Sequence, residues 1–166
     1  MPIEVGQIIP DANLMVRNAD KTHSIVPISE KLNGRKVVLV GLPGAFTGTC
    51  SGEHLPSLIN AWPKLTTKGI DEIIVFAAND PQVMRAWADI SGANDAGITL
   101  LADPMSEFTE SLGLRFDAPV AGLIGRCIRF AAIVNDGRVE VLRFEEKPVG
   151  CSLTSGDAIL DVLEQA

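Results

Sequence analysis

The chain has 166 residues, of which 46% are hydrophobic and 21% are charged. This length fits one domain over residues 1–166 that needs no disulfide bonds, and the hydrophobic share excludes a disordered chain. The formal net charge of -7 argues against nucleic acid and anionic membrane surfaces as partners, because like charges repel. Charged residues also interrupt every apolar run before the roughly 20 residues that a membrane span needs.

The start of the chain and the cysteines bear on the cellular compartment. Residues 1–5 lack the basic segment and apolar stretch that open a signal peptide, so we expect a cytoplasmic protein. The three cysteines, Cys50, Cys127 and Cys151, are an odd number and do not suggest a disulfide framework. In a reducing compartment the question becomes which of these thiols is reactive.

The first third of the chain predicts a hairpin, a strand and a helix. Residues 11–26 carry short apolar runs around a polar turn, which is typical of a peripheral hairpin. Residues 36–42 form a continuous apolar, β-branched run, as in a strand buried on both faces. Apolar residues then recur at steps of three and four over residues 55–65, which predicts a helix that begins close to Cys50. We expect Pro63 to kink or shorten it.

The middle of the chain repeats a strand followed by a helix. Residues 73–78 predict a second buried strand, and Asp80 with the proline after it predicts the start of a helix whose inward face reaches Ile90. Residues 98–101 predict a third strand, and Asp103, again followed by proline, predicts another helix start.

The last third predicts a hairpin and a final helix. Residues 129–134 and 139–144 flank an Asn-Asp-Gly turn, and a helix follows Thr154. Strands and helices therefore alternate before the chain closes on an antiparallel pair. This order predicts an α/β fold with a central mixed sheet flanked by helices and an N-terminal hairpin.

Cys50 lies where such a fold places its chemistry. It follows a strand end and a Pro-Gly turn, in the first turn of a helix whose dipole and free N–H groups favour a thiolate. A lone cysteine is more often a buried structural residue. Its polar neighbours over residues 47–51 favour the reactive interpretation here.

A resemblance makes this interpretation specific. Pro43, Thr47 and Cys50 reproduce the Pro-x-x-x-Thr-x-x-Cys signature of peroxiredoxins, and residues 43–47 with 54–56 resemble the type II group in particular. The likeness runs through nearly the whole chain, with further similar segments at residues 75–87, 101–104 and 129–131.

The resemblance implies a thioredoxin-like fold and a peroxidase reaction. Cys50 would attack hydrogen peroxide or an alkyl hydroperoxide and become a sulfenic acid. Pro43, Thr47 and Arg129 would contact the peroxide, with the Thr47 hydroxyl as a hydrogen-bonding group and Arg129 as the fixed cation. Thr47 could equally cap the helix, and the two roles can coexist.

Two positions near this motif need comment. Arg126 competes with Arg129 for the role of the cation, but on one strand the two side chains would point to opposite faces, so we expect only one to reach Cys50. The Arg-Phe-Ala pattern of the family favours Arg129. Gly48 stands where the family commonly has proline, and we expect this change to preserve activity.

A second thiol must resolve the sulfenic acid. Cys151 occupies the place where atypical two-cysteine members of the group carry their resolving cysteine, and we expect the Pro148–Gly150 segment before it to be mobile. Alternatively, an external thiol resolves Cys50, with thioredoxin or glutathione and glutaredoxin as the reductants. We expect Cys127 to be buried and to have a structural role.

Glu53 and His54 lie three and four residues after Cys50, on what the helical spacing predicts to be the same face. Cys50 and His54 could be half of a metal site, but no second pair has ligand spacing. We therefore expect no metal and no cofactor, and assign His54 and Glu53 to support of the loop.

The main alternative to an enzyme is a redox sensor or thiol-regulated binding protein in which oxidation of Cys50 is a signal. Steady consumption of peroxide with a thiol reductant distinguishes the two. The resemblance to the type II group further implies a homodimer.

Overall fold

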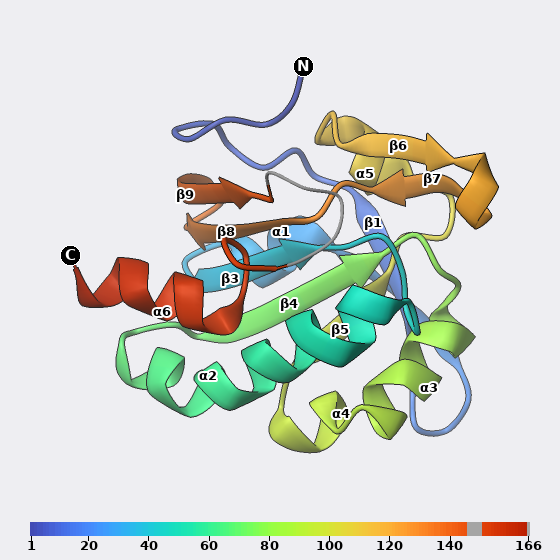
Figure 1. The fold of residues 1–166 in the computed structure, drawn as a ribbon, viewed down its shortest axis with the longest axis horizontal. Coiled ribbons are helices and arrows are strands. Elements are labelled where there is room, and N and C mark those ends of the chain that lie inside the picture. The colour runs from blue at the N-terminus through green and yellow to red at the C-terminus, as the bar shows by residue number, and fades with distance from the viewer. Residues whose placement is uncertain (146–150, 166) are drawn as a thin grey trace.

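The computed structural model describes residues 1–145 and 151–165. A seven-stranded sheet in the order β2-β1-β5-β4-β3-β8-β9 forms its centre (Figure 1). Its strands are β1 (Asn13–Arg17), β2 (His23–Pro27), β3 (Lys36–Gly41), β4 (Glu72–Ala77), β5 (Thr99–Ala102), β8 (Phe130–Asn135) and β9 (Arg138–Phe144). A separate antiparallel pair consists of β6 (Arg115–Ala118) and β7 (Leu123–Cys127).

The helices cover both faces of this sheet. They are α1 (Ile28–Leu32), α2 (Leu55–Thr67), α3 (Pro81–Ile90), α4 (Ala93–Ala96), α5 (Glu107–Ser111) and α6 (Gly156–Glu164), with a π-helical turn η1 (Cys50–His54) and a short 3-10 helix η2 (Pro119–Ala121). Helices α2 and α6 pack side by side on one face (Figure 1).

The sheet is mixed, as the sequence predicts. β3, β4 and β5 run parallel, whereas β8 pairs with β3 and β1 pairs with β5 in the antiparallel sense. The N-terminal hairpin of β1 and β2 forms one edge, and β9 forms the other. Every residue of β4 is buried, because helices cover both faces at the centre.

Alternate residues of the central strands belong to two different hydrophobic clusters, one on each face of the sheet. Val38 and Val40 of β3 face the cluster under α2, α3 and α6, whereas Val37 and Leu39 face the cluster under α1 and α5. This two-sided burial is why the strand is a continuous apolar run rather than an alternating one.

Several details differ from the sequence prediction. Helix α2 continues through Pro63 to Thr67 and is not shortened. Ile90, predicted to face inward, is 75% exposed because it is the last residue of α3. Asp103 does not begin α5, which starts four residues later. Instead its buried carboxylate accepts hydrogen bonds from the backbone N–H groups of Phe108 and Thr109.

The pair β6–β7 was not predicted, and it changes the place of Arg126. That residue lies on β7 in the small sheet, whereas Arg129 lies just before β8 of the large sheet. The argument that the two arginines alternate along one strand is therefore wrong. In the part of the chain that the structure describes, no helix is long and apolar enough to cross a membrane.

Candidate active site

Cys50 lies at the carboxyl end of β3, as expected. The strand ends at Gly41, and the chain then turns through a loop in which Phe46 adopts a left-handed conformation (φ 61°) before the helical segment begins at Gly48. Cys50 opens the π-helical turn η1 and is fully buried. Non-glycine residues rarely take a positive φ, so the neighbouring structure must hold Phe46 in place.

Sheet register brings Arg129 to the same place. Gly41 at the end of β3 pairs with Phe130 at the start of β8, so the residue before β8 lies where the Cys50 loop begins. The Nη2 of Arg129 donates a hydrogen bond to the Sγ of Cys50 at 3.0 Å. Arg129 itself is only 6% exposed. A fixed cation therefore lies within hydrogen-bonding distance of a buried sulfur.

His54 holds the other side of the guanidinium. The Nη1 of Arg129 lies 2.7 Å from Nδ1 of His54, and Nε2 of His54 lies 2.8 Å from the carbonyl oxygen of Thr154. An arginine can only donate, so Nδ1 accepts, and Nε2 carries the proton that it donates to Thr154. Burial and then the charge of Arg129 lower the pKa of His54 to about 4. His54 is thus a neutral ring that orients Arg129.

One donor of Arg129 remains free. Its buried Nε has no hydrogen-bond partner among the described residues. Buried donors are nearly always satisfied, and an exception at a reactive centre suggests a group that a substrate would engage.

Thr47 supplies a hydroxyl near the same turn. Its Oγ1 donates to the carbonyl oxygen of Gly44 at 2.7 Å, which leaves the oxygen lone pairs available as acceptors. No backbone N–H of the described residues donates to this oxygen, so the structure does not show the helix-capping role.

Three further side chains fix the loop, a role that the sequence does not predict for any of them. The Nη1 of Arg126 donates to the carbonyl oxygen of Pro43 at 2.9 Å, Asn79 accepts from the backbone N–H of Ala45 at 2.9 Å, and the Nε1 of Trp87 donates to Ser51 Oγ at 3.0 Å. Asn79 follows the end of β4, next to β3 in the sheet, and that position was the one signal available in the sequence.

Two glycines of the loop differ in how closely they are surrounded. A Cβ at Gly44 would collide with the guanidinium of Arg126, whereas a Cβ at Gly48 would meet no atom within 4 Å. A side chain at position 44 would therefore displace the Arg126 guanidinium, whereas position 48 has room for a larger residue.

Cys151 lies beside η1 rather than against Cys50. Its Sγ donates to the carboxylate of Glu53 at 3.7 Å, and its pKa is raised by partial burial and then by the charge of Glu53. Glu53 is exposed and His54 is buried, so the prediction that they share a face is wrong. The expected mobile segment Pro148–Gly150 lies outside the described residues.

Residues after Cys151 are held firmly. The carboxylate of Glu145 accepts hydrogen bonds from the backbone N–H groups of Leu153 and Thr154, the Thr154 hydroxyl and the Ser152 hydroxyl. Thr154 is also the residue whose carbonyl binds His54. A chain of contacts thus links the Cys151 segment to Arg129.

Cys127 is separated from Cys50 by the sheet. Cys50 belongs to the cluster under α2, and Cys127 belongs to the cluster on the opposite face. It is fully buried, and burial raises the pKa of its thiol. The prediction that Cys127 is buried is confirmed. All three cysteines are free in this structure, and no group of three or more His, Cys, Asp or Glu side chains placed to hold a metal occurs among the described residues.

Residues 4–160 match the model of the redoxin family. Among curated proteins, the chain is 38% identical over 162 residues to peroxiredoxin-2B of Arabidopsis thaliana, covering 98% of this chain and 99% of the relative. It is 39% identical over 145 residues to peroxiredoxin-2C of Oryza sativa subsp. japonica, covering 87% and 89%.

Solved structures show the same likeness. The reduced Prx3 of Vibrio vulnificus in complex with H2O2 superimposes with a TM-score of 0.89 at 38% identity, over 97% of this chain and 99% of that one. Peroxiredoxin 5 of Alvinella pompejana superimposes with a TM-score of 0.85 at 30% identity, over 99% and 100%.

Proposed function

Because this chain belongs to the redoxin family and, within it, to the type II peroxiredoxins, it is a thiol-dependent peroxidase with a thioredoxin-like fold, and we propose that Cys50 attacks the hydroperoxide. The contact of 3.0 Å between Arg129 Nη2 and Cys50 Sγ is the observation that supports this assignment. The redox-sensor alternative is not favoured, because the curated relatives that cover 87% and 98% of the chain are peroxiredoxins.

The oxidation step needs a nucleophile, an acceptor and a donor. The Cys50 thiolate attacks one peroxide oxygen, the S–O bond forms, the O–O bond breaks, and the departing oxygen takes a proton and leaves as water or alcohol. The free lone pairs of Thr47 Oγ1 can accept from the hydroperoxide O–H, and the unpartnered Nε–H of Arg129 can donate to a peroxide oxygen. Arg129 thereby stabilises the charge that moves to the leaving oxygen.

Pro43 has a supporting part in this proposal. Its carbonyl oxygen is bound by Arg126, so the ring is fixed at the edge of the Cys50 loop. We infer that this fixed, partly exposed proline would contact the hydroperoxide.

We assign resolution of the sulfenic acid to Cys151. Its thiol attacks the Cys50 sulfur, a disulfide forms and water leaves. The proximity of Cys151 to η1, through Glu53, supports this assignment. Two equivalents of an external thiol then restore both cysteines, and thioredoxin or glutaredoxin with glutathione are the proposed donors. A reducing compartment such as the cytosol supplies such thiols.

Loss of the nucleophile tests the proposal most directly. Cys50→Ser should abolish steady peroxide consumption with added dithiothreitol, because a neutral hydroxyl cannot replace a thiolate. Cys127→Ala is the matched control, since it removes a thiol on the opposite face of the sheet. Turnover by the Cys50 variant at the wild-type rate would disprove the assignment.

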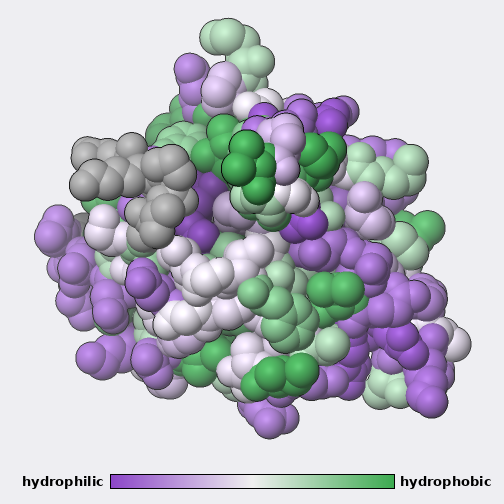
Figure 2. Space-filling model, turned by 45° about the vertical axis from the view of Figure 1, so that its right-hand side comes forward, coloured by the Kyte–Doolittle hydropathy of each residue, from purple (hydrophilic) through white to green (hydrophobic). Residues whose placement is uncertain are grey.

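The proposed homodimer rests on four exposed apolar residues, namely Phe46 of the Cys50 loop, Met105 before α5, Val120 of η2 and Ile124 of β7. Hydrogen bonds from Arg126 to Pro43 and from Ser106 to Gly125 hold the segments that carry them together. Figure 2 brings the side of the molecule with β6 and β7 forward, and hydrophobic residues form several patches there. Sedimentation equilibrium should show a dimer that Val120→Asp dissociates. A wild-type monomer at high concentration would exclude it.

A further inference from the structure

A cavity away from Cys50 opens where two strands of the sheet part. The antiparallel pair β1–β5 has a single registered residue pair, Met15 with Ala102. Beyond this pair the end of β1 and the start of β5 enclose a cavity of about 270 Å³ together with α3 and α4. None of its lining residues belongs to the Cys50 site.

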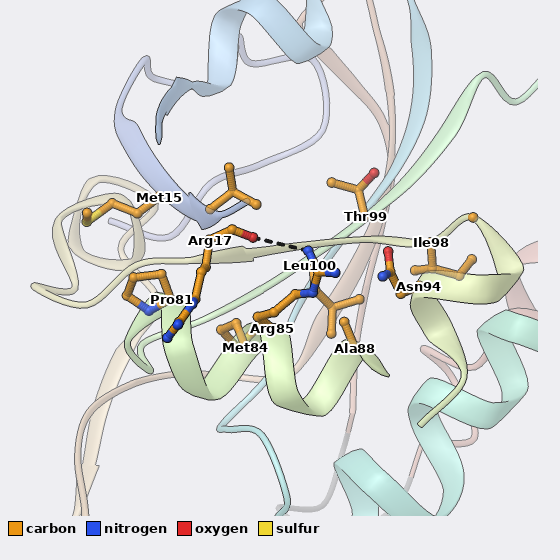
Figure 3. Close-up of a pocket in the computed structure, with 12 residues that line it drawn as sticks. Met15, Arg17, Pro81, Met84, Arg85, Ala88, Asn94, Ile98, Thr99 and Leu100 are labelled. Carbon is orange, nitrogen blue, oxygen red and sulfur yellow. Dashed lines mark hydrogen bonds between the residues drawn. The ribbon is translucent and has the colours of Figure 1, made fainter. Parts of the chain in front are cut away.

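Arg85 enters this opening from α3. Its Nη1 donates to the carbonyl oxygen of Arg17 at 3.4 Å, where the next strand would otherwise pair (Figure 3). Its Nε donates to Asp89 at 3.0 Å, so one side of the guanidinium is neutralised. The Nη end of the Arg85 guanidinium points toward β1 and lines the cavity (Figure 3).

Arg17 adds a second positive charge. Its side chain extends from β1 toward Pro81 at the start of α3 (Figure 3). Among the described residues no carboxylate lies within ion-pair distance of it. An adjoining hollow of about 310 Å³ shares both arginines and adds Lys21, with Asp89 as its acidic residue.

The charge and polarity of the cavity point to one class of ligand. Its charged lining residues are Arg17 and Arg85, in a chain whose net charge is -7. Its deep side consists of buried apolar residues of α3 and β5, among them Met84, Ala88 and Leu100. Guanidinium groups bind carboxylate and phosphate through paired hydrogen bonds, and an apolar floor binds hydrocarbon.

We propose that this cavity binds a small amphiphilic anion, with a carboxylate or phosphate head on Arg85, a second positive charge from Arg17 in the lining, and a short hydrocarbon chain against Met84, Ala88 and Leu100. The volume lies near the lower end for ligand pockets, which limits the ligand to a short chain. The site is separate from the peroxidase reaction, so the proposal does not depend on which reductant that reaction uses.

Binding of three probes to the full chain, followed by NMR chemical shifts, tests the proposal. Hexanoate carries both features, hexanol lacks the charge and acetate lacks the chain. Hexanoate should bind at least tenfold more tightly than either, with shifts centred on α3 and the start of β5. Equal binding of acetate would indicate a nonspecific ion site, and equal binding of hexanol an apolar cavity alone. Either result overturns the proposal, as does no binding of hexanoate at millimolar concentration.

Variants assign the binding to the two arginines. Arg85→Gln should weaken hexanoate binding about tenfold, because it removes a charged hydrogen bond, and Arg17→Gln should weaken it less, because it removes only a nearby positive charge. Arg143→Gln removes the same charge on β9, at the opposite edge of the sheet, and should bind as the wild type does. Thermal unfolding confirms that each variant is folded. Equal affinity in Arg85→Gln and Arg143→Gln would overturn the assignment.

A steric variant tests the chain-binding side. Ala88→Leu adds volume at the cavity without changing charge, so it should abolish hexanoate binding while the peroxidase rate reports an intact fold. Unchanged affinity in a folded Ala88→Leu protein would place the ligand elsewhere.

Discussion

Arg129 binds Cys50 across 79 positions of sequence, with Nη2 3.0 Å from Sγ. The same guanidinium is held by the neutral ring of His54, so its orientation is set before any substrate arrives. Preorganised donors of this kind lower the barrier because they need not reorient as charge develops.

The first prediction compares the two arginines of the site. Arg129→Lys should lower the second-order rate constant with hydrogen peroxide by about 10²–10³, because a lysine cannot contact sulfur, His54 and peroxide together. Arg126→Lys should cost less than about tenfold, since one ammonium donor can still reach the Pro43 carbonyl. Stopped-flow peroxide kinetics measure both. A larger loss in Arg126→Lys would transfer the role of the cation to that residue.

The second prediction concerns pH and His54. Its pKa in the folded protein is about 4, against 6.5 as its ordinary value, so between these values the unfolded chain binds more protons. The free energy of unfolding should therefore rise with pH between about 4 and 6.5. Above this range the contribution of His54 to that free energy should stay constant. The contribution amounts to about 3 kcal/mol.

His54→Gln removes this dependence while its amide can still accept from Arg129 and donate to Thr154. Urea unfolding between pH 5 and pH 8 should show the stability of the wild type rising relative to the variant. His23→Gln, at an exposed position, is the matched histidine control. Parallel curves for wild type and His54→Gln would contradict the neutral buried state.

How much of this site the sequence predicts depends on the range of each contact. The sequence predicts Cys50 and Thr47 as site residues because the signature that contains them is short, running from Pro43 to Cys50 within one loop and one helical turn. The cap at Asp80 was found for the same reason, since its carboxylate accepts from Val83 three residues on. Arg126 and Asn79 were missed as loop supports because their contacts to Pro43 and Ala45 span 83 and 34 positions. Such contacts depend on strand order and register, which local patterns do not specify.

The third prediction uses the open space at Gly48. Gly48→Pro should raise the melting temperature by about 1–4 °C, because proline restricts the unfolded chain and is favoured in the first turn of a helix. The peroxidase rate should change less than about threefold, since a Cβ at this position meets no atom within 4 Å. Ser51→Pro is the contrasting control, because it removes the hydrogen bond from Ser51 N–H to the Thr47 carbonyl. A destabilised Gly48→Pro protein would show that the backbone there does not fit proline.

The last prediction is a disulfide between Cys50 and Cys151 within one chain after stoichiometric peroxide. The two Cα atoms must come within roughly 7 Å, and Cys50 is fully buried under Arg129. Four hydrogen bonds to Glu145 hold residues 152–154, so we expect the turn η1 to move. A π-helical turn is rare and lacks the regular α-helical bonding, which makes it the place to unwind.

Mass spectrometry of peroxide-treated protein, digested without reduction, should detect the peptide pair that joins Cys50 to Cys151. Cys151→Ser should instead accumulate sulfenic and then sulfinic acid at Cys50, because no internal thiol competes with further oxidation. Cys127→Ala should form the disulfide as the wild type does, since its thiol lies across the sheet. If the wild type shows only sulfinic acid, an external thiol resolves Cys50. The same conclusion follows if Cys151→Ser turns over as fast as the wild type both with thioredoxin and with glutathione plus glutaredoxin.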